Sequence, residues 1–159
     1  MAVEIEKKFL VKNDSWKEDT TSMIYYQGYL CSVSGRTVRI RIAGSKGFLT
    51  VKGKRSGISR LEFEYPIPLE EARELLEKFC ERPFIHKRRH LKNYGGFLWE
   101  IDEFYGDNEG LVVAEIELEN EKQKFPRPSW LGKEVSRDRR YYNAGLRAFP
   151  YKDWKDEEK

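Results

Sequence analysis

A period-two alternation between charged and uncharged residues recurs along this chain, and it constrains the possible folds most strongly. In the first such stretch, residues 3–11, Glu4, Glu6 and Lys8 share one parity, and Val3, Ile5 and Phe9 share the other. Successive side chains of a β-strand point to opposite faces. Each stretch therefore predicts a strand with one ionic face and one largely apolar face.

Turn residues divide the chain into about eight such strands. Glycine-rich segments at 44–47, 93–96 and 106–110 separate neighbouring stretches and predict hairpins. Helical spacing of apolar residues predicts one helix at 69–79, and a short helix is expected at 141–148. The expected strands are 3–11, 24–31, 36–43, 48–54, 58–67, 84–91, 97–105 and 111–119. The pattern favours a mainly β, single-domain fold over 1–159, with an antiparallel sheet long enough to close into a barrel.

The charged faces differ in sign from strand to strand. Three are basic (Arg39/Arg41, Lys52/Lys54, Lys87/Arg89), two are acidic (Glu100/Asp102, Glu115/Glu117) and two are mixed (Glu4/Glu6/Lys8, Arg60/Glu62/Glu64). One interpretation is an ordinary sheet with its apolar face inward and its charges in solvent. The other is a closed barrel whose charges line the interior and whose outer apolar face is covered by helices.

A charged interior restricts what the barrel can contain. Burying an unpaired ion costs several kcal/mol, so such a lumen must hold water, paired charges or charged ligands. Carboxylates suit hard divalent cations, and arginine and lysine suit an anion with many oxygens, such as a polyphosphate. An interior of this kind therefore indicates a site for a metal ion and a phosphate chain together.

The ordered charged motifs resemble those of the CYTH superfamily, also called triphosphate tunnel metalloenzymes. The resemblance spans nearly the whole chain, and the compact chain resembles the short bacterial members, which hydrolyse inorganic triphosphate. The matching motifs are Glu4-x-Glu6-x-Lys8, Gln27-Gly28-Tyr29-Leu30, Arg39-x-Arg41, Lys52, Ser59-Arg60-x-Glu62-x-Glu64, Lys87-x-Arg89, Glu100-x-Asp102, Glu115-x-Glu117, Glu134-Val135 and Asp138-x-Arg140-Tyr141.

The resemblance implies an eight-stranded antiparallel barrel with a hydrophilic tunnel, and it assigns roles to the charged residues. Mg²⁺ or Mn²⁺ would be held by Glu4, Glu6, Glu115, Glu117 and Glu100. Triphosphate oxygens would be bound by Lys8, Arg39, Arg41, Lys52, Arg60, Lys87, Arg89 and Arg139. The catalytic set would be Lys8, Lys87, Glu62, Glu64 and Asp102, with either Lys8 or Lys87 stabilising the departing oxygen.

Several functions remain open on the sequence. The first is metal-dependent hydrolysis of inorganic triphosphate. Others within the superfamily are a class IV adenylate cyclase and a nucleoside or thiamine triphosphatase. A non-catalytic polyphosphate- or nucleotide-binding module is a further alternative, and a basic barrel that binds nucleic acid is another. The acidic rows argue against the binding module, whereas the nucleic-acid-binding barrel predicts a basic exterior and salt-sensitive binding to long strands.

Composition sets the remaining expectations. Thirty basic residues are nearly matched by 27 acidic ones, and the net charge of +3 is too small to indicate a nucleic-acid partner. The two cysteines, the lack of a signal peptide and the lack of a long apolar run predict a cytoplasmic protein without a membrane partner. A homodimer is compatible with such a barrel. The glycine-rich turns lack the spacing of a phosphate loop, and the His86/His90 pair lies on an extended segment without cysteine partners, which argues against a zinc site.

Overall fold

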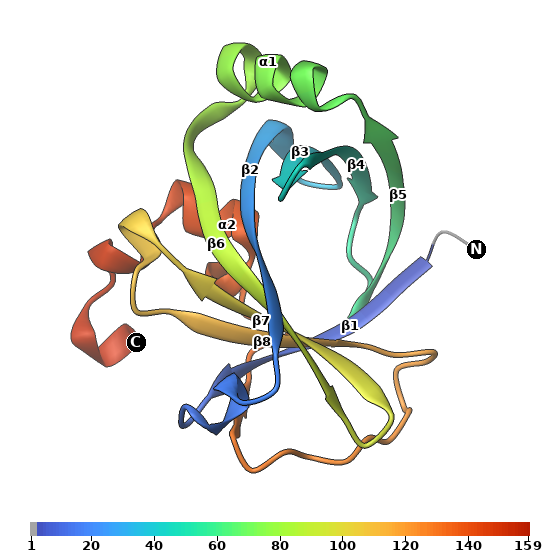
Figure 1. Ribbon diagram of the computed structural model, residues 1–159, viewed down its shortest axis with the longest axis vertical. Helices are drawn as coiled ribbons and strands as arrows, with labels where there is room; N and C mark the ends of the chain where they lie inside the picture. The colour runs from blue at the N-terminus through green and yellow to red at the C-terminus, as the bar shows by residue number, and fades with distance from the viewer. Residues whose placement is uncertain (1–2) are drawn as a thin grey trace.

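The computed structural model describes residues 3–159, so Met1 and Ala2 of the expected domain lie outside the described residues. Nine strands are found in this described part, and all of them belong to one antiparallel sheet (Figure 1). The strands are β1 (Val3–Val11), β2 (Thr21–Val33), β3 (Arg36–Ala43), β4 (Lys46–Gly53), β5 (Ser59–Ile67), β6 (Glu81–Tyr94), β7 (Phe97–Phe104), β8 (Val112–Glu117) and β9 (Leu131–Glu134).

The helices are few and short. The two α-helices are α1 (Leu69–Phe79) and α2 (Asn143–Ala148), and the 3₁₀ turns are η1 (Ser15–Lys17), η2 (Gly106–Asn108), η3 (Arg139–Tyr141), η4 (Tyr151–Asp153) and η5 (Asp156–Glu158). The helix expected at 69–79 is confirmed. The one expected at 141–148 is divided, because extended backbone at Tyr142 separates η3 from α2. No helix within residues 3–159 combines the length and apolar content needed to cross a membrane.

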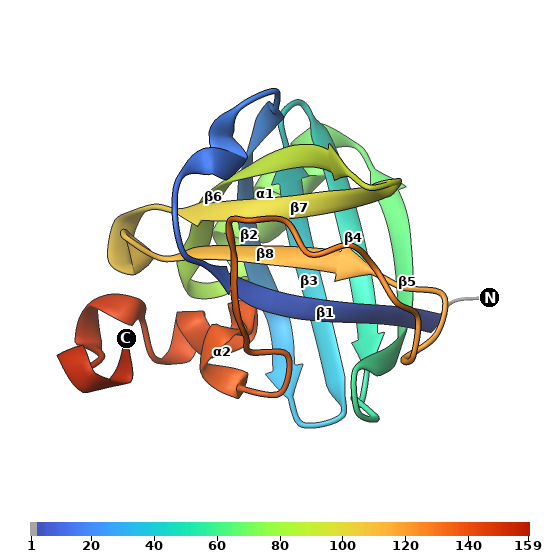
Figure 2. The same ribbon diagram turned by 90° about the horizontal axis from the view of Figure 1, so that it is seen from below.

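Strand β1 closes the sheet into a barrel. The hydrogen-bonded order is β5-β4-β3-β2-β6-β7-β8-β1, and β1 pairs again with β5 through Val3↔Leu61, Glu4↔Arg60 and Ile5↔Ser59. The later part of β1 pairs with β8 and also with β9, the short strand that the alternation pattern did not predict. Figure 2 shows β1, β7 and β8 crossing one side of the barrel, with the C-terminal segment beside one end. The predicted eight-stranded antiparallel barrel is thus confirmed, with one strand added.

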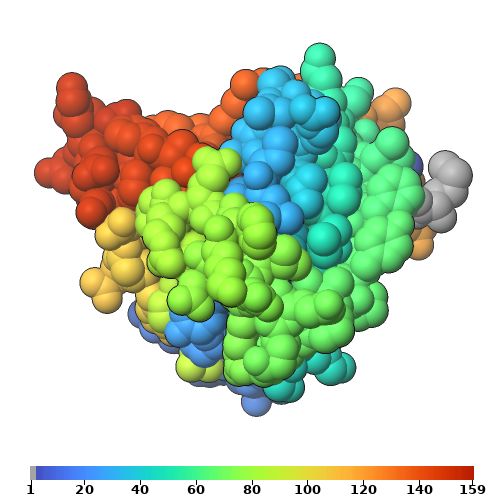
Figure 3. All heavy atoms as spheres, turned by 90° about the horizontal axis from the view of Figure 1, so that it is seen from above, coloured from blue at the N-terminus to red at the C-terminus, as the bar shows by residue number. Residues whose placement is uncertain are grey.

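The apolar core lies outside the barrel wall. Helix α1 packs on β3 and β4 through a cluster that includes Ile40, Ala72 and Leu76, and it covers this side of the molecule in Figure 3. The C-terminal segment covers a second region, where Leu146 and Trp154 are buried. Over the third region, no α-helix is found within residues 3–159. Its buried aromatic residues are Phe9, Trp16, Trp99 and Trp130, and loop residue Phe125 packs against them. The expected cover of helices is therefore only partly correct.

Two glycines allow α1 to lie directly on the sheet. A Cβ atom at Gly47 would lie 2.6 Å from the Cβ of Ala72, and one at Gly28 would lie 2.8 Å from the Cβ of Cys80. Both distances are far below ordinary van der Waals contact. Gly53, also in β4, has room by contrast, since its Cβ would be 3.6 Å from that of Leu61.

We expect Gly47→Ala to destabilise the fold, because the new methyl group must push α1 away from β4. Overpacking of this kind costs about 1–3 kcal/mol. Denaturant unfolding at equilibrium measures the loss. Gly53→Ala in the same strand is the matched control, and it should change the free energy of unfolding much less. Equal losses for the two variants would contradict the packing argument.

Candidate active site

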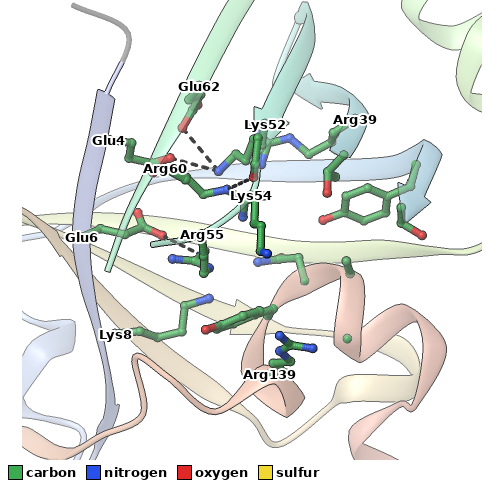
Figure 4. Close-up of a pocket in the computed structure, with 18 of the residues that line it drawn as sticks. Glu4, Glu6, Lys8, Arg39, Lys52, Lys54, Arg55, Arg60, Glu62 and Arg139 are labelled. Carbon is green, nitrogen blue, oxygen red and sulfur yellow. Dashed lines mark hydrogen bonds and ion pairs between the residues drawn. The ribbon is translucent and has the colours of Figure 1, made fainter. Parts of the chain in front are cut away.

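The ionic rows of the strands face the interior of the barrel. They line a cavity of about 770 Å³. In Figure 4, Glu4, Glu6 and Lys8 extend from β1, and dashed lines join Glu4 to Lys52 and Glu6 to Arg55. Fourteen of the sixteen residues assigned from the sequence line this cavity: Glu4, Glu6, Lys8, Arg39, Arg41, Lys52, Arg60, Glu62, Glu64, Arg89, Glu100, Glu115, Glu117 and Arg139. An ordinary sheet with its charges in solvent is therefore excluded.

Barrel closure sorts the charges into two halves. The adjacent strands β7, β8, β1 and β5 carry the inward carboxylates, whereas β4, β3 and β6 carry most of the inward cations, and β2, which lies between β3 and β6, has no lysine or arginine. Lys8 on β1 and Arg60 on β5 are the exceptions. A ligand in this cavity thus meets a mainly basic wall on one side and a mainly acidic wall on the other.

Like charges crowd one another on the basic wall. Burial, and then the neighbouring Arg39 and Arg89, lower the pKa of Arg41 to about 10. Arg60, which β5 contributes to the other wall, is shifted in the same direction, because burial and Arg55 lower its pKa. An anion placed against these guanidinium groups would relieve the repulsion.

The acidic wall shows the opposite shift. Burial, and then Glu4, Glu100 and Glu6, raise the pKa of Glu117. Burial and Glu6 raise the pKa of Glu115. Crowded carboxylates of this kind offer the oxygen ligands that hard divalent cations prefer, and a cation would relieve their repulsion. The donor set therefore suits a divalent metal.

The carboxylates are not gathered around one point. Within residues 3–159, no group of three or more acidic, histidine or cysteine side chains is close enough to form a metal site. Several of the carboxylates are paired with cations instead. Lys52 Nζ lies 3.2 Å from Glu4 Oε2 and 3.3 Å from Glu62 Oε2, and Lys8 Nζ lies 3.8 Å from Glu115 Oε1. A metal ion bound here would compete with these lysines for the carboxylate oxygens.

Lys87 and Asp102, the two remaining predicted residues, lie beneath the cavity and do not line it. Both are almost fully buried. Lys87 Nζ donates to Asp102 Oδ2 at 2.7 Å and to Asn143 Oδ1 at 2.9 Å, and Arg89 Nε donates to Asp102 Oδ1 at 2.8 Å. Burial lowers the pKa of Lys87 to about 7, with Arg89 and Arg41 adding to the shift and Asp102 opposing it. These residues form a polar floor under the basic wall.

Sequence reasoning missed several cavity residues that come from loops and the C-terminal segment. The Arg55 guanidinium lies 4.4 Å from the ring centre of Tyr142 and 4.0 Å from Glu6 Oε1. Arg147 of α2 also lines the cavity. The Nε atoms of Arg39, Arg55 and Arg147 are buried without a hydrogen-bond partner among the described residues. The signal that the sequence offers is the basic run Lys54-Arg55, but glycines flank it at 53 and 57, and such a segment predicts a hairpin turn.

Residues 2–143 match the model of a protein family described as the CYTH domain. The chain belongs to the CYTH domain family. The resemblance seen in the charged motifs is thereby confirmed. This CYTH domain is 51% identical over 156 residues to an inorganic triphosphatase of Acetivibrio thermocellus, a match that covers 98% of this chain and 100% of the relative.

Two further comparisons agree with this membership. An inorganic triphosphatase of Nitrosomonas europaea is 35% identical over 147 residues, covering 90% of this CYTH domain and 95% of the relative. A crystal structure of an inorganic triphosphatase matches the fold with a TM-score of 0.66 at 32% identity, covering 91% of this chain and 97% of that one. The matches extend over nearly the full length of the relatives.

We expect Glu117→Gln to stabilise the metal-free protein at pH 7. The pKa of Glu117 is raised in the fold, so the folded state binds a proton more tightly than the unfolded chain does. Stability therefore falls as pH rises from the ordinary glutamate pKa through the raised one. Removing the charge should raise Tm by about 1–2 °C, a modest effect because the site is partly solvated. Thermal unfolding in chelator measures it.

The stabilising effect should shrink as pH is lowered towards the raised pKa, where Glu117 is itself protonated. Glu119→Gln is the matched control, since this exposed residue lies just beyond β8 and outside the cavity. An equal gain for both variants, or a gain that grows at acid pH, would contradict crowding of carboxylates in the cavity.

Proposed function

We propose that this protein hydrolyses inorganic triphosphate to pyrophosphate and orthophosphate with the help of a divalent metal ion, Mg²⁺ or Mn²⁺. The observation that carries the proposal is the division of one cavity into a basic wall and an acidic wall. A metal–triphosphate complex has the matching arrangement of charge. The names of the two curated relatives support the same activity.

The basic wall binds the phosphate oxygens. Arg39, Arg41 and Lys52 present their charged groups from β3 and β4, and Arg89 does so from β6. Arginine suits this role because its planar donors match phosphate oxygens in pairs. Lys8, Arg60 and Arg139 complete the binding set, and Arg55 joins it from the loop between β4 and β5.

The acidic wall would hold the metal through Glu4, Glu6, Glu115, Glu117 and Glu100. When bound, such an ion neutralises phosphate charge and polarises the phosphoryl group. The carboxylates of Glu62 and Glu64 line the cavity beside Lys52 and Arg39, where they can orient the attacking water and accept its proton.

The reaction breaks one phosphoric anhydride bond. Water oxygen attacks the terminal phosphorus in line with the bridging oxygen, and that oxygen leaves with the electron pair on pyrophosphate. Lys8 is better placed than Lys87 to stabilise it, because Lys8 lines the cavity while Lys87 is fully enclosed by the floor. Lys87 and Asp102 then support the basic wall from behind.

We expect Glu4→Gln to abolish turnover of inorganic triphosphate while the protein stays folded. The change removes a carboxylate from the acidic wall, and the amide oxygen that replaces it is a weaker metal ligand. Orthophosphate release in Mg²⁺ or Mn²⁺ is the measurement, and circular dichroism confirms the fold. Glu70→Gln on the exposed face of α1 is the matched control and should keep full activity. Full activity in Glu4→Gln would refute the metal assignment.

The same assay distinguishes the related activities. Inorganic triphosphate, ATP and thiamine triphosphate are compared at equal concentration, and ATP products are examined for cyclic AMP and pyrophosphate. Fastest orthophosphate release from inorganic triphosphate supports the proposal. Formation of cyclic AMP as the main product would replace it with a cyclase, and tight binding without turnover would replace it with a binding module.

We expect Arg55→Gln to raise KM for inorganic triphosphate about 3- to 10-fold with a smaller change in kcat. Arg55 lines the cavity from the loop between β4 and β5, so it contributes charge for binding. Steady-state kinetics measures both constants. Arg73→Gln on the exposed surface of α1 is the control, and it should leave KM unchanged. A fall in kcat alone would place Arg55 in the chemical step instead.

A further inference from the structure

One amide side chain from the C-terminal segment, that of Asn143, connects Lys87 of the polar floor to Gln27 of β2. Asn143 is the first residue of α2. Its Oδ1 accepts a hydrogen bond from Lys87 Nζ at 2.9 Å and another from Gln27 Nε2 at 3.0 Å. A carbonyl oxygen has two lone pairs, so both are used. The C-terminal segment is thereby fastened to strands β2 and β6 from within the barrel.

The bonding order of this floor is fixed by its donors. Lysine and arginine can only donate, so the atom facing Lys87 must be the oxygen of Asn143, and the atom facing Arg41 must be the oxygen of Gln27. Arg41 Nε donates to Gln27 Oε1 at 2.8 Å, which turns the Gln27 amide nitrogen towards Asn143. A single arrangement satisfies all the groups. If either amide were rotated by 180°, its NH2 group would face another hydrogen-bond donor, Lys87 in the case of Asn143 and Arg41 in the case of Gln27.

This series of hydrogen bonds ends at two arginines that line the cavity, and each of them donates a hydrogen bond through Nε to a side chain of the series. Arg41 is held by Gln27, and Arg89 is held by Asp102 at 2.8 Å. Lys87 connects the two branches, since it donates to both Asp102 and Asn143. Fixing Nε fixes the plane of a guanidinium group. The terminal nitrogens of Arg41 are then left to face the cavity that Arg41 lines.

We propose that Asn143 and Gln27 are positioning residues that orient Arg41 and Lys87 for hydrolysis of the phosphate chain. The inference rests on the proposed function, and it assigns these two amides a role through Arg41 and Lys87 and not through contact with substrate. Misplacing a substrate-positioning group by about 1 Å can cost on the order of 100-fold in rate. The role of the C-terminal segment then includes alignment of the basic wall as well as cover for the apolar surface.

The first test replaces Asn143 by leucine, which has a similar shape and no acceptor. We expect Asn143→Leu to lower kcat for inorganic triphosphate about 10- to 100-fold, with KM changed less than about 3-fold. Asn143→Asp keeps an acceptor oxygen at the same place and should recover most of the lost kcat. Wild-type kcat in Asn143→Leu, or no recovery in a folded Asn143→Asp, would overturn the proposal.

The second test asks whether Asn143 acts through Gln27. Gln27→Met removes the link to Arg41 while the bond from Lys87 to Asn143 can persist, so it should also lower kcat. The double variant should be no slower than the slower single variant, within about 2-fold, because both changes break one connection. If the fold-losses in kcat of the two single variants multiply in the double variant, the two residues act independently, and the proposed series of hydrogen bonds from Asn143 through Gln27 to Arg41 is refuted. If Asn143→Leu does not fold, Gln27→Met and Asn143→Asp decide the question alone.

A readout independent of activity comes from the arginine Nε–H signals in NMR spectra. In the wild-type protein the Nε–H protons of Arg41 and Arg89 should both be protected from exchange with water. Asn143→Leu should lose the protection at Arg41 and keep it at Arg89, whose acceptor is Asp102. Unchanged protection at Arg41 would overturn the proposed positioning. If wild-type protein releases no orthophosphate, the proposed function fails, while this measurement still decides whether Asn143 holds Arg41.

A matched control separates positioning from simple attachment of the C-terminal segment. Asn108 Oδ1 accepts a hydrogen bond from the backbone nitrogen of Tyr151 at 2.9 Å, so it anchors the same segment away from the floor. Asn108→Ala should lower Tm and leave kcat within about 2-fold of wild type. An equal loss of kcat in Asn108→Ala and Asn143→Leu would show that anchoring alone matters.

Discussion

The short pairing between β1 and β5 is the constraint on which the rest of the structure depends. Among the described residues, three pairs close the barrel there, and β1 then leaves β5 and continues along β8. Closure brings the carboxylates of β5 beside those of β1, β8 and β7. Without it, β5 would be a free edge and its acidic row would face solvent. The two-sided cavity is thus a product of topology as much as of residue type.

Many ionisable groups in one cavity make the metal-free protein less stable than its packing alone would allow. Isolated buried ions cost several kcal/mol each. The fold limits the cost by pairing Lys52 with two glutamates and Asp102 with Lys87 and Arg89. Some repulsion remains, as the shifted pKa values of Arg41 and Glu117 show. Repulsion that a ligand relieves is typical of a site built for binding.

The sequence predicted the strands and the rows of charge because a period of two is a local property. Glu4 and Glu6, or Arg39 and Arg41, share a face in any strand. Alternation could not tell inside from outside, and the family resemblance supplied that choice. The alternation pattern could not predict Arg55 and Asn143 as cavity residues, because a loop residue and a short C-terminal helix are brought to the cavity only by tertiary packing. Strand β9 is four residues long and has too little alternation to be recognised.

The opposed walls have a thermodynamic consequence for the two proposed ligands. A triphosphate entering alone is drawn to the arginines but repelled by the glutamates across the cavity, and a metal ion entering alone meets the reverse. Each ligand screens the other from the unfavourable wall. Their affinities are therefore linked, and by reciprocity the factor by which the cation tightens the anion equals the factor by which the anion tightens the cation.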